Sequence, residues 1–120
     1  MKSFTDLEAW QIGMKLVDET YKISSNFPSE EKYGLTSQLR KAANSVVANT
    51  AEGFGRYTYP DKANKYVIAR GECSEVKAFL LIAIQQNFVN KEESANAFNY
   101  CERTGQLLFG LIKSSHKLAK

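Results

Sequence analysis

The chain has 120 residues, of which only seven are glycine and two are proline, which excludes collagen-like, linker-like and turn-dense small β proteins. A hydrophobic fraction of 43% beside 24% charged residues predicts one globular domain spanning residues 1–120 rather than a disordered chain. The formal net charge of +3 is too small to identify a nucleic-acid-binding protein by itself.

The first predicted helix begins at Thr5 and ends before Pro28. Thr5 and Glu8 have the spacing of a capping box, in which each side chain bonds to the other residue's backbone N–H. Helical backbone is disfavoured before a proline, so Pro28 stops the element. The expected apolar stripe, widened by Ile12, Leu16 and Ile23, consists of Leu7, Trp10, Met14, Val17 and Tyr21.

A second helix is expected from about Gly34 to Arg56. Small residues dominate its apolar stripe, so another helix can approach it closely. Gly53 and Gly55 suit the exit from this helix, and Pro60 suits the first turn of the next. The predicted stripe consists of Leu35, Leu39, Ala42, Val46 and Thr50 or Gly53.

A third helix is expected from about Pro60 to Asn87 and a fourth from Asn90, where Glu93 completes a second capping-box spacing. The third helix is apolar on nearly every side beyond Phe79. The core positions of the third helix are Tyr66, Ala69, Cys73, Val76, Leu80 and Ala83. Those of the fourth are Ala97, Cys101, Thr104, Leu108, Leu111, Ser115 and Leu118.

These four helices, joined by short connections, predict an all-α fold: an up-down-up-down antiparallel four-helix bundle. No strand pattern competes with them. The apolar surface of the third helix exceeds what a monomeric bundle can bury, so we expect the protein to self-associate.

Enzymatic sites are hard to assemble from the residues of this sequence. His116 is the only histidine and lies beside Lys113 and Lys117 in the last helical turn, without a partner for a catalytic triad. A single histidine also cannot supply the paired ligands of a di-metal bundle, and no phosphate-binding loop is present. We therefore predict no catalytic residue, no metal site and no cofactor.

The two cysteines, Cys73 and Cys101, lie far apart in the sequence and form no metal-ligand motif. Both fall on core stripes and are interpreted as inert buried thiols. The longest apolar run, residues 78–84, is too short to span a membrane, and the N-terminal residues have no apolar stretch of signal-peptide length. The prediction is a cytoplasmic protein that does not enter the membrane.

Residues 35–70 hold six lysines and arginines against two acidic residues. With interleaved aromatic rings, such cations provide phosphate contacts and stacking platforms for nucleic acid. Ordinary solvated helix faces look similar, and this alternative stays open. The candidate nucleic-acid-binding residues are Arg40, Lys41, Arg56, Tyr57, Tyr59, Lys62, Lys65 and Arg70.

A second, polar line runs along the second helix beside its apolar stripe. Its mixture of amide, carboxylate and guanidinium groups suits a polar seam between subunits, although a solvated face is the alternative. The candidate interface residues are Gln38, Ser45, Asn49, Glu52 and Arg56. Arg56 therefore belongs to both candidate sites.

Several blocks of the sequence resemble the four-helix-bundle proteins encoded in intervening sequences of bacterial large-subunit ribosomal RNA genes, which are sometimes labelled ribosomal. The resemblance covers nearly the whole chain, and the last helix matches only in pattern. Lys41 and Glu72 stand where the family usually has Arg and Ser, which makes the second and third helices less basic. The matching blocks include FTDLEAWQ at 4–11, YGLTSQLRKAA at 33–43, ANTAEGFGR at 48–56 and ARG at 69–71.

That family is similar to the accessory variability proteins of diversity-generating retroelements, which form pentameric barrels and bind nucleic acid and a reverse transcriptase. The resemblance therefore implies a ring-like homopentamer with an RNA or DNA role, and a reverse transcriptase as partner only where one is encoded nearby. Our leading hypothesis is a non-enzymatic oligomer that binds structured nucleic acid, above all RNA. The alternative is a scaffold that recruits a polymerase or reverse transcriptase and has no nucleic-acid affinity of its own.

Overall fold

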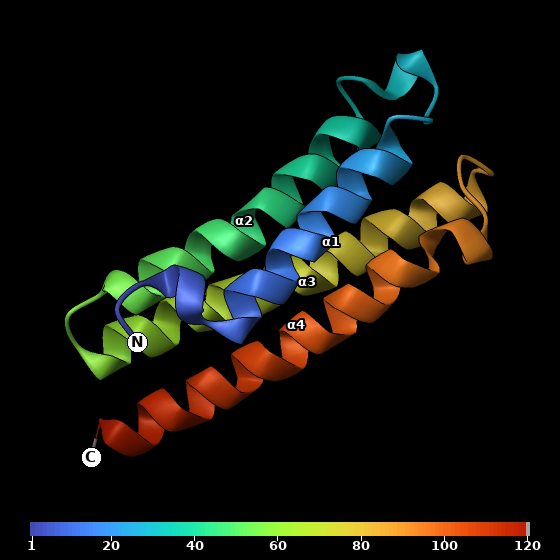
Figure 1. The fold of residues 1–120 in the computed structure, drawn as a ribbon. Helices are drawn as coiled ribbons and strands as arrows, with labels where there is room; N and C mark the ends of the chain where they lie inside the picture. Colours follow the sequence, from blue (N-terminus) through green and yellow to red (C-terminus); the bar gives the residue numbers. More distant parts are fainter. Residues whose placement is uncertain (120) are drawn as a thin grey trace.

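A computed structural model describes residues 1–119. Four long helices lie antiparallel, and each packs against its neighbours in the sequence while α1 closes the bundle against α4 (Figure 1). The bundle measures 48 × 25 × 22 Å. The helices are α1 (Glu8–Ser24), α2 (Leu35–Gly55), α3 (Tyr59–Gln85) and α4 (Lys91–Leu118), with short 3-10 turns η1 (Phe4–Asp6) and η2 (Ser29–Glu31). The predicted all-α, up-down-up-down bundle is confirmed.

Two of the helix starts follow the sequence closely. Asn90 Oδ1 accepts from the Glu93 N–H at 2.7 Å and Glu93 returns the bond to the Asn90 N–H, so the predicted capping box of α4 is confirmed. Thr58 caps α3 by accepting from the Asp61 N–H at 3.2 Å, with Pro60 in the first turn as expected.

The start of the first helix was predicted wrongly. The capping box at the N-terminus joins Ser3 and Asp6 and closes the turn η1, and α1 begins afterwards at Glu8 with no side-chain cap. Ser3 and Asp6 have the same spacing as Thr5 and Glu8, so the sequence contains two overlapping capping boxes. The Ser3–Asp6 box is the one that forms. The Asp6 carboxylate accepts a further hydrogen bond from the Lys2 N–H at 3.0 Å, which favours this box over the one at Thr5 and Glu8.

The apolar face of α1 is rotated from the predicted stripe. Leu7, Leu16 and Ile23 are buried as predicted, but Met14 and Tyr21 are exposed. The other buried positions of α1 are Ala9, Gly13, Thr20 and Ser24. Gly13 explains the rotation, because a Cβ there would lie 2.8 Å from Val47 Cγ1 of α2. The helix therefore turns Ala9 and Gly13 inward beside Leu16. Trp10 lies at the flank, where it meets the ring of Phe4 edge-on at 5.4 Å.

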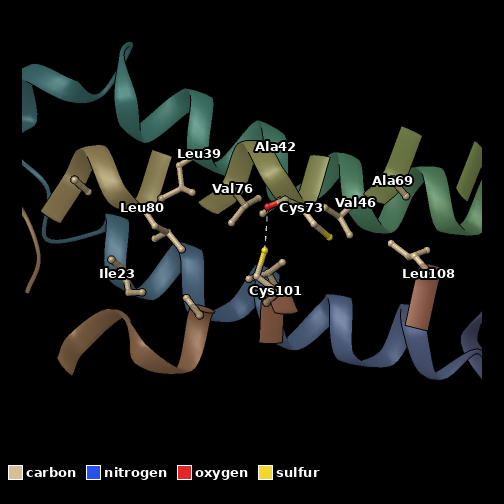
Figure 2. Packing of buried hydrophobic residues seen from close by; sticks show 14 of the residues in the cluster. Ile23, Leu39, Ala42, Val46, Ala69, Cys73, Val76, Leu80, Cys101 and Leu108 are labelled. Atoms are coloured by element: carbon tan, nitrogen blue, oxygen red, sulfur yellow. Dashed lines mark hydrogen bonds between the residues drawn. The ribbon is translucent and has the colours of Figure 1, made fainter. Parts of the chain in front are cut away.

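The core stripes of α2 and α3 are confirmed, and Figure 2 shows their side chains meeting in the centre of the bundle. Gly53 is a point of close helix contact, since a Cβ there would lie 2.6 Å from the ring of Tyr66. On α4 the prediction fails near the end: Ile112 is buried in place of Leu111, and Leu118 is exposed. None of the helices described over residues 1–119 is long and apolar enough to cross a membrane.

Candidate interfaces for subunits and nucleic acid

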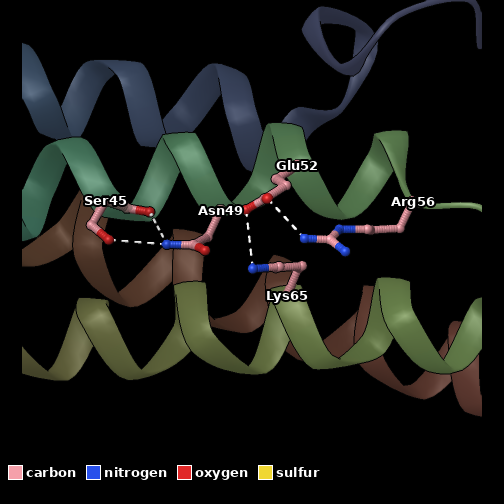
Figure 3. A network of polar contacts seen from close by, with 5 residues as sticks. All are labelled: Ser45, Asn49, Glu52, Arg56 and Lys65. Carbon is pink, nitrogen blue, oxygen red and sulfur yellow. Dashed lines mark hydrogen bonds and ion pairs between the residues drawn. The ribbon is translucent and has the colours of Figure 1, made fainter.

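The polar line of α2 faces α3 within the same chain. The Glu52 carboxylate accepts from Arg56 Nη2 at 2.9 Å and forms an ion pair with Lys65 Nζ of α3 at 3.1 Å (Figure 3). Asn49 Nδ2 donates to the backbone oxygen and the hydroxyl of Ser45, at 2.9 and 3.0 Å. Four of the five predicted seam residues therefore have polar partners inside the protomer.

These bonds favour the ionised form of Glu52. The hydrogen bond from Lys65, and after it the one from Arg56, holds the pKa of the Glu52 carboxyl below its ordinary value of 4.5. Because both Glu52 and Arg56 are largely exposed, water and salt screen this pair, and its contribution to stability is small.

The other half of the polar line borders a groove of about 340 Å³ between α2 and α3. Burial, and then the neighbouring Glu75, raises the pKa of Glu72, while Lys41 across the groove opposes that rise. Two carboxyl groups face one ammonium here, so this groove is a poor place for a phosphate. Its lining residues are Gln38, Lys41, Ala42, Ser45, Glu72, Glu75 and Phe79.

The predicted cationic residues do not form one surface. Arg40 faces α1, where its Nε donates to Ser24 Oγ at 2.8 Å and its guanidinium lies 4.6 Å from the centre of the Tyr21 ring. Its Nη2 also donates to the Tyr21 carbonyl in the last turn of α1, so Arg40 stabilises that helix end. Arg70 lies on the opposite side of the bundle, stacked 4.9 Å from the Phe109 ring of α4.

The remaining candidates gather at the connection between α2 and α3. Tyr57 is 97% exposed and Tyr59 is 41% exposed, and Arg56 adjoins them. Lys62 Nζ donates to the Phe54 carbonyl at 2.6 Å and so complements the C-terminal end of α2. The structure thus brings Arg56, Lys62, Lys65 and the two tyrosines to one end of the bundle.

That end contains cations that the sequence reasoning missed. The N-terminal residues and the C-terminal end of α4 lie at the same end of the bundle as the α2–α3 connection (Figure 1). We define the basic end as Lys2, Arg56, Lys62, Lys65, Lys113 and Lys117. An up-down topology places the C-termini of the second and fourth helices at the same end of the bundle. The predicted topology could therefore have shown that Lys113 and Lys117 lie near Arg56.

Charge is separated along the bundle axis. Residues 1–13, 50–68 and 103–119, which form the basic end and its surroundings, contain seven lysines and arginines against four acidic residues. Residues 18–35 and 84–96, at the opposite tip, contain three against six. The net charge is therefore +3 around the basic end and −3 at the opposite tip.

The outer side of α3, directed away from the core, exposes an apolar face. Val67 is 50%, Leu81 58% and Ile82 44% exposed, and Gly71 and Ala78 lie exposed between them. We call these five residues the α3 face. Exposed large apolar residues along one helix are typical of a surface that another protein covers, although Ser74 and Glu75 interrupt this face between Gly71 and Ala78.

Nothing in residues 1–119 gathers three or more His, Cys, Asp or Glu side chains in a way that could hold a metal ion. His116 is exposed in the last turn of α4, with no hydrogen-bond partner in the described part of the chain.

Known proteins share this four-helix fold. A protein with unknown function from the S23 ribosomal protein family of Bacteroides thetaiotaomicron has a similar structure, with a TM-score of 0.80 and 21% sequence identity. The alignment covers 88% of this chain and 95% of that one, and at this identity it shows the shared fold. The search of curated proteins found no significant match. The family model of the 23S rRNA-intervening sequence protein matches residues 5–110, and the chain therefore belongs to that family.

Proposed function

We propose that this protein binds structured RNA through its basic end, as a homo-oligomer in the cytoplasm. The observation that carries the proposal is the separation of charge along the bundle axis, with its cationic surplus at the end where Tyr57 and Tyr59 are exposed. Lysine and arginine bind phosphates by displacing counterions, and exposed aromatic rings stack on unpaired bases. The family description, which names 23S rRNA, supports RNA from such an intervening sequence as the ligand.

Assembly strengthens this proposal, because a net charge of +3 on one protomer binds RNA weakly. The α3 face supports self-association, since its exposed large side chains are buried when a second copy packs on it. A ring that places several basic ends on one rim multiplies the phosphate contacts. The resemblance stated above suggests a pentamer as its stoichiometry.

The experiment is a salt titration of binding to an RNA hairpin taken from an intervening sequence, followed by fluorescence anisotropy. If five to six phosphates are contacted, the affinity falls by roughly 10³ between 50 and 200 mM salt. Absence of binding at 50 mM salt contradicts the proposal. An affinity that does not change with salt contradicts the phosphate contacts in particular.

The α3 face also favours a second function, a scaffold that recruits a protein partner such as a polymerase or a reverse transcriptase. An apolar helix face suits a protein partner better than a nucleic acid. This function predicts that the oligomer binds no RNA at low salt and that substitutions on the α3 face abolish capture of the partner. The RNA titration distinguishes the two functions.

A further inference from the structure

Two buried cysteines meet at the contact between α3 and α4. Cys101 Sγ donates a hydrogen bond to the Cys73 carbonyl oxygen at 3.1 Å, and the two side chains are 0% and 4% exposed (Figure 2). The neighbouring core positions are the small residues Ala69 and Ala97. Small side chains let the two helices approach closely, which is the first requirement for a disulfide between them.

A groove lies outside this contact, between α3 and α4. It has a volume of about 460 Å³, and both cysteines line it together with Lys77. Gly71 and Gly105 leave it open, because a Cβ at either position would meet no atom within 4 Å. Because the two cysteines are 0% and 4% exposed, a small oxidant such as hydrogen peroxide, rather than a protein, is the reagent proposed to enter from this groove.

The two thiols have different acidities. Hydrogen bonding with Cys73, and after it the charge of Lys77, lowers the pKa of Cys101, although burial acts in the opposite direction. The interaction with the Cys101 side chain, together with burial, raises the pKa of Cys73. The thiolate is the reactive form of cysteine, so Cys101 is the nucleophile of the pair and Cys73 remains a thiol.

We propose that hydrogen peroxide oxidises Cys73 and Cys101 to an intramolecular disulfide that joins α3 to α4. The Cys101 thiolate attacks one peroxide oxygen, the O–O bond breaks, and the departing hydroxide takes a proton to form water, leaving a sulfenic acid. The Cys73 sulfur then attacks the Cys101 sulfur while its proton passes to the leaving hydroxyl group, and the S–O bond breaks with release of a second water. Two thiols lose two electrons in total, and one peroxide becomes two waters.

The direct test treats the folded, full-length protein with hydrogen peroxide and maps peptides under non-reducing conditions. We expect loss of two hydrogen atoms, a peptide linking Cys73 to Cys101, and recovery of the thiols with a dithiol reductant. In the Cys73→Ser variant, dimedone should label Cys101 as its sulfenic acid. The Cys101→Ser variant should give no labelling of Cys73.

A pair of glycine variants tests whether peroxide reaches the cysteines through the groove. Gly105→Leu fills the groove and should slow disulfide formation severalfold, whereas Gly110→Leu, at an equally open helix position outside the groove, should leave the rate unchanged. Circular dichroism verifies that both variants are folded. Equal rates in the two variants, a disulfide only between different chains, or dimedone on Cys73 instead of Cys101 would overturn the proposal.

Discussion

Gly53 lies at a close contact between α2 and α3. An alanine Cβ there would lie 2.6 Å from the ring of Tyr66, which is buried and cannot move away freely. Gly53→Ala should therefore lower the free energy of unfolding by about 1–3 kcal/mol, the usual cost of overpacking a core. Urea unfolding measures the change.

The matched control for this prediction is Gly110→Ala on α4, where the added Cβ meets open space. This substitution should raise stability by about 0.5–1 kcal/mol, because alanine loses less backbone entropy than glycine in a helix. Equal stability of the two variants would contradict the close contact between Gly53 and the Tyr66 ring.

Glu52 makes stability depend on pH. Its pKa is lowered in the folded protein by Lys65 and Arg56, so its stabilising effect is present above the unfolded-state pKa. The effect is lost as the pH falls through the lowered folded-state value. Thermal melts should therefore show wild type more stable than Glu52→Gln near neutral pH, with the difference disappearing in acid.

Salt supplies a second check on Glu52, because an exposed ion pair is screened. The difference between wild type and Glu52→Gln should shrink at high salt. Glu30→Gln is the control, since Glu30 belongs to none of the ion pairs described for residues 1–119. A difference for Glu52→Gln that stays constant with pH would show that Glu52 acts through packing instead.

At the scale of elements, the cap of α4 provides the clearest test. Asn90→Ala removes the acceptor for the Glu93 N–H and should cost about 1 kcal/mol. Thr5→Ala should change stability by less than about 0.5 kcal/mol, because Ser3 rather than Thr5 closes the N-terminal capping box. Chemical denaturation of both variants decides which capping residues matter, and a large loss for Thr5→Ala contradicts the structure.

The elements also show how far sequence reasoning reaches. The helices, their order and the core stripes of α2 and α3 follow from apolar periodicity, because regular stripes there coincide with the buried side. On α1 two large apolar residues of the predicted stripe, Met14 and Tyr21, were misleading, because both are exposed. A bundle packs small residues where helices are closest, so Gly13 and Ala9, which carry little hydrophobic signal, determine the rotation of the helix.

The α3 face makes a prediction about assembly. Leu81→Glu places a charge in the proposed subunit contact and should dissociate the oligomer into 13.5 kDa monomers in light scattering. Leu118→Glu changes an equally exposed leucine outside the α3 face and should leave the assembly intact. A wild-type protein that is monomeric at working concentrations contradicts self-association.

At the scale of the whole molecule, the topology decides which charges act together. Sequence proximity grouped Arg40 and Arg70 with the α2–α3 connection, yet these two residues lie on opposite sides of the bundle. Lys113 and Lys117, far away in the sequence, join the basic end because α2 and α4 end at the same place. Side-chain partners such as Ser24 for Arg40 could not be predicted, since they depend on how the helices rotate.

The most direct measurement compares the two ends of the bundle in RNA binding. Lys113→Gln/Lys117→Gln removes two cations from the basic end, and Lys22→Gln/Lys32→Gln removes two from the opposite tip. In anisotropy titrations with the same RNA hairpin, the first pair should weaken binding about tenfold or more and reduce the salt slope by about 1–2. The second pair should leave the affinity within about twofold of wild type. Equal losses from both ends would contradict binding through the basic end.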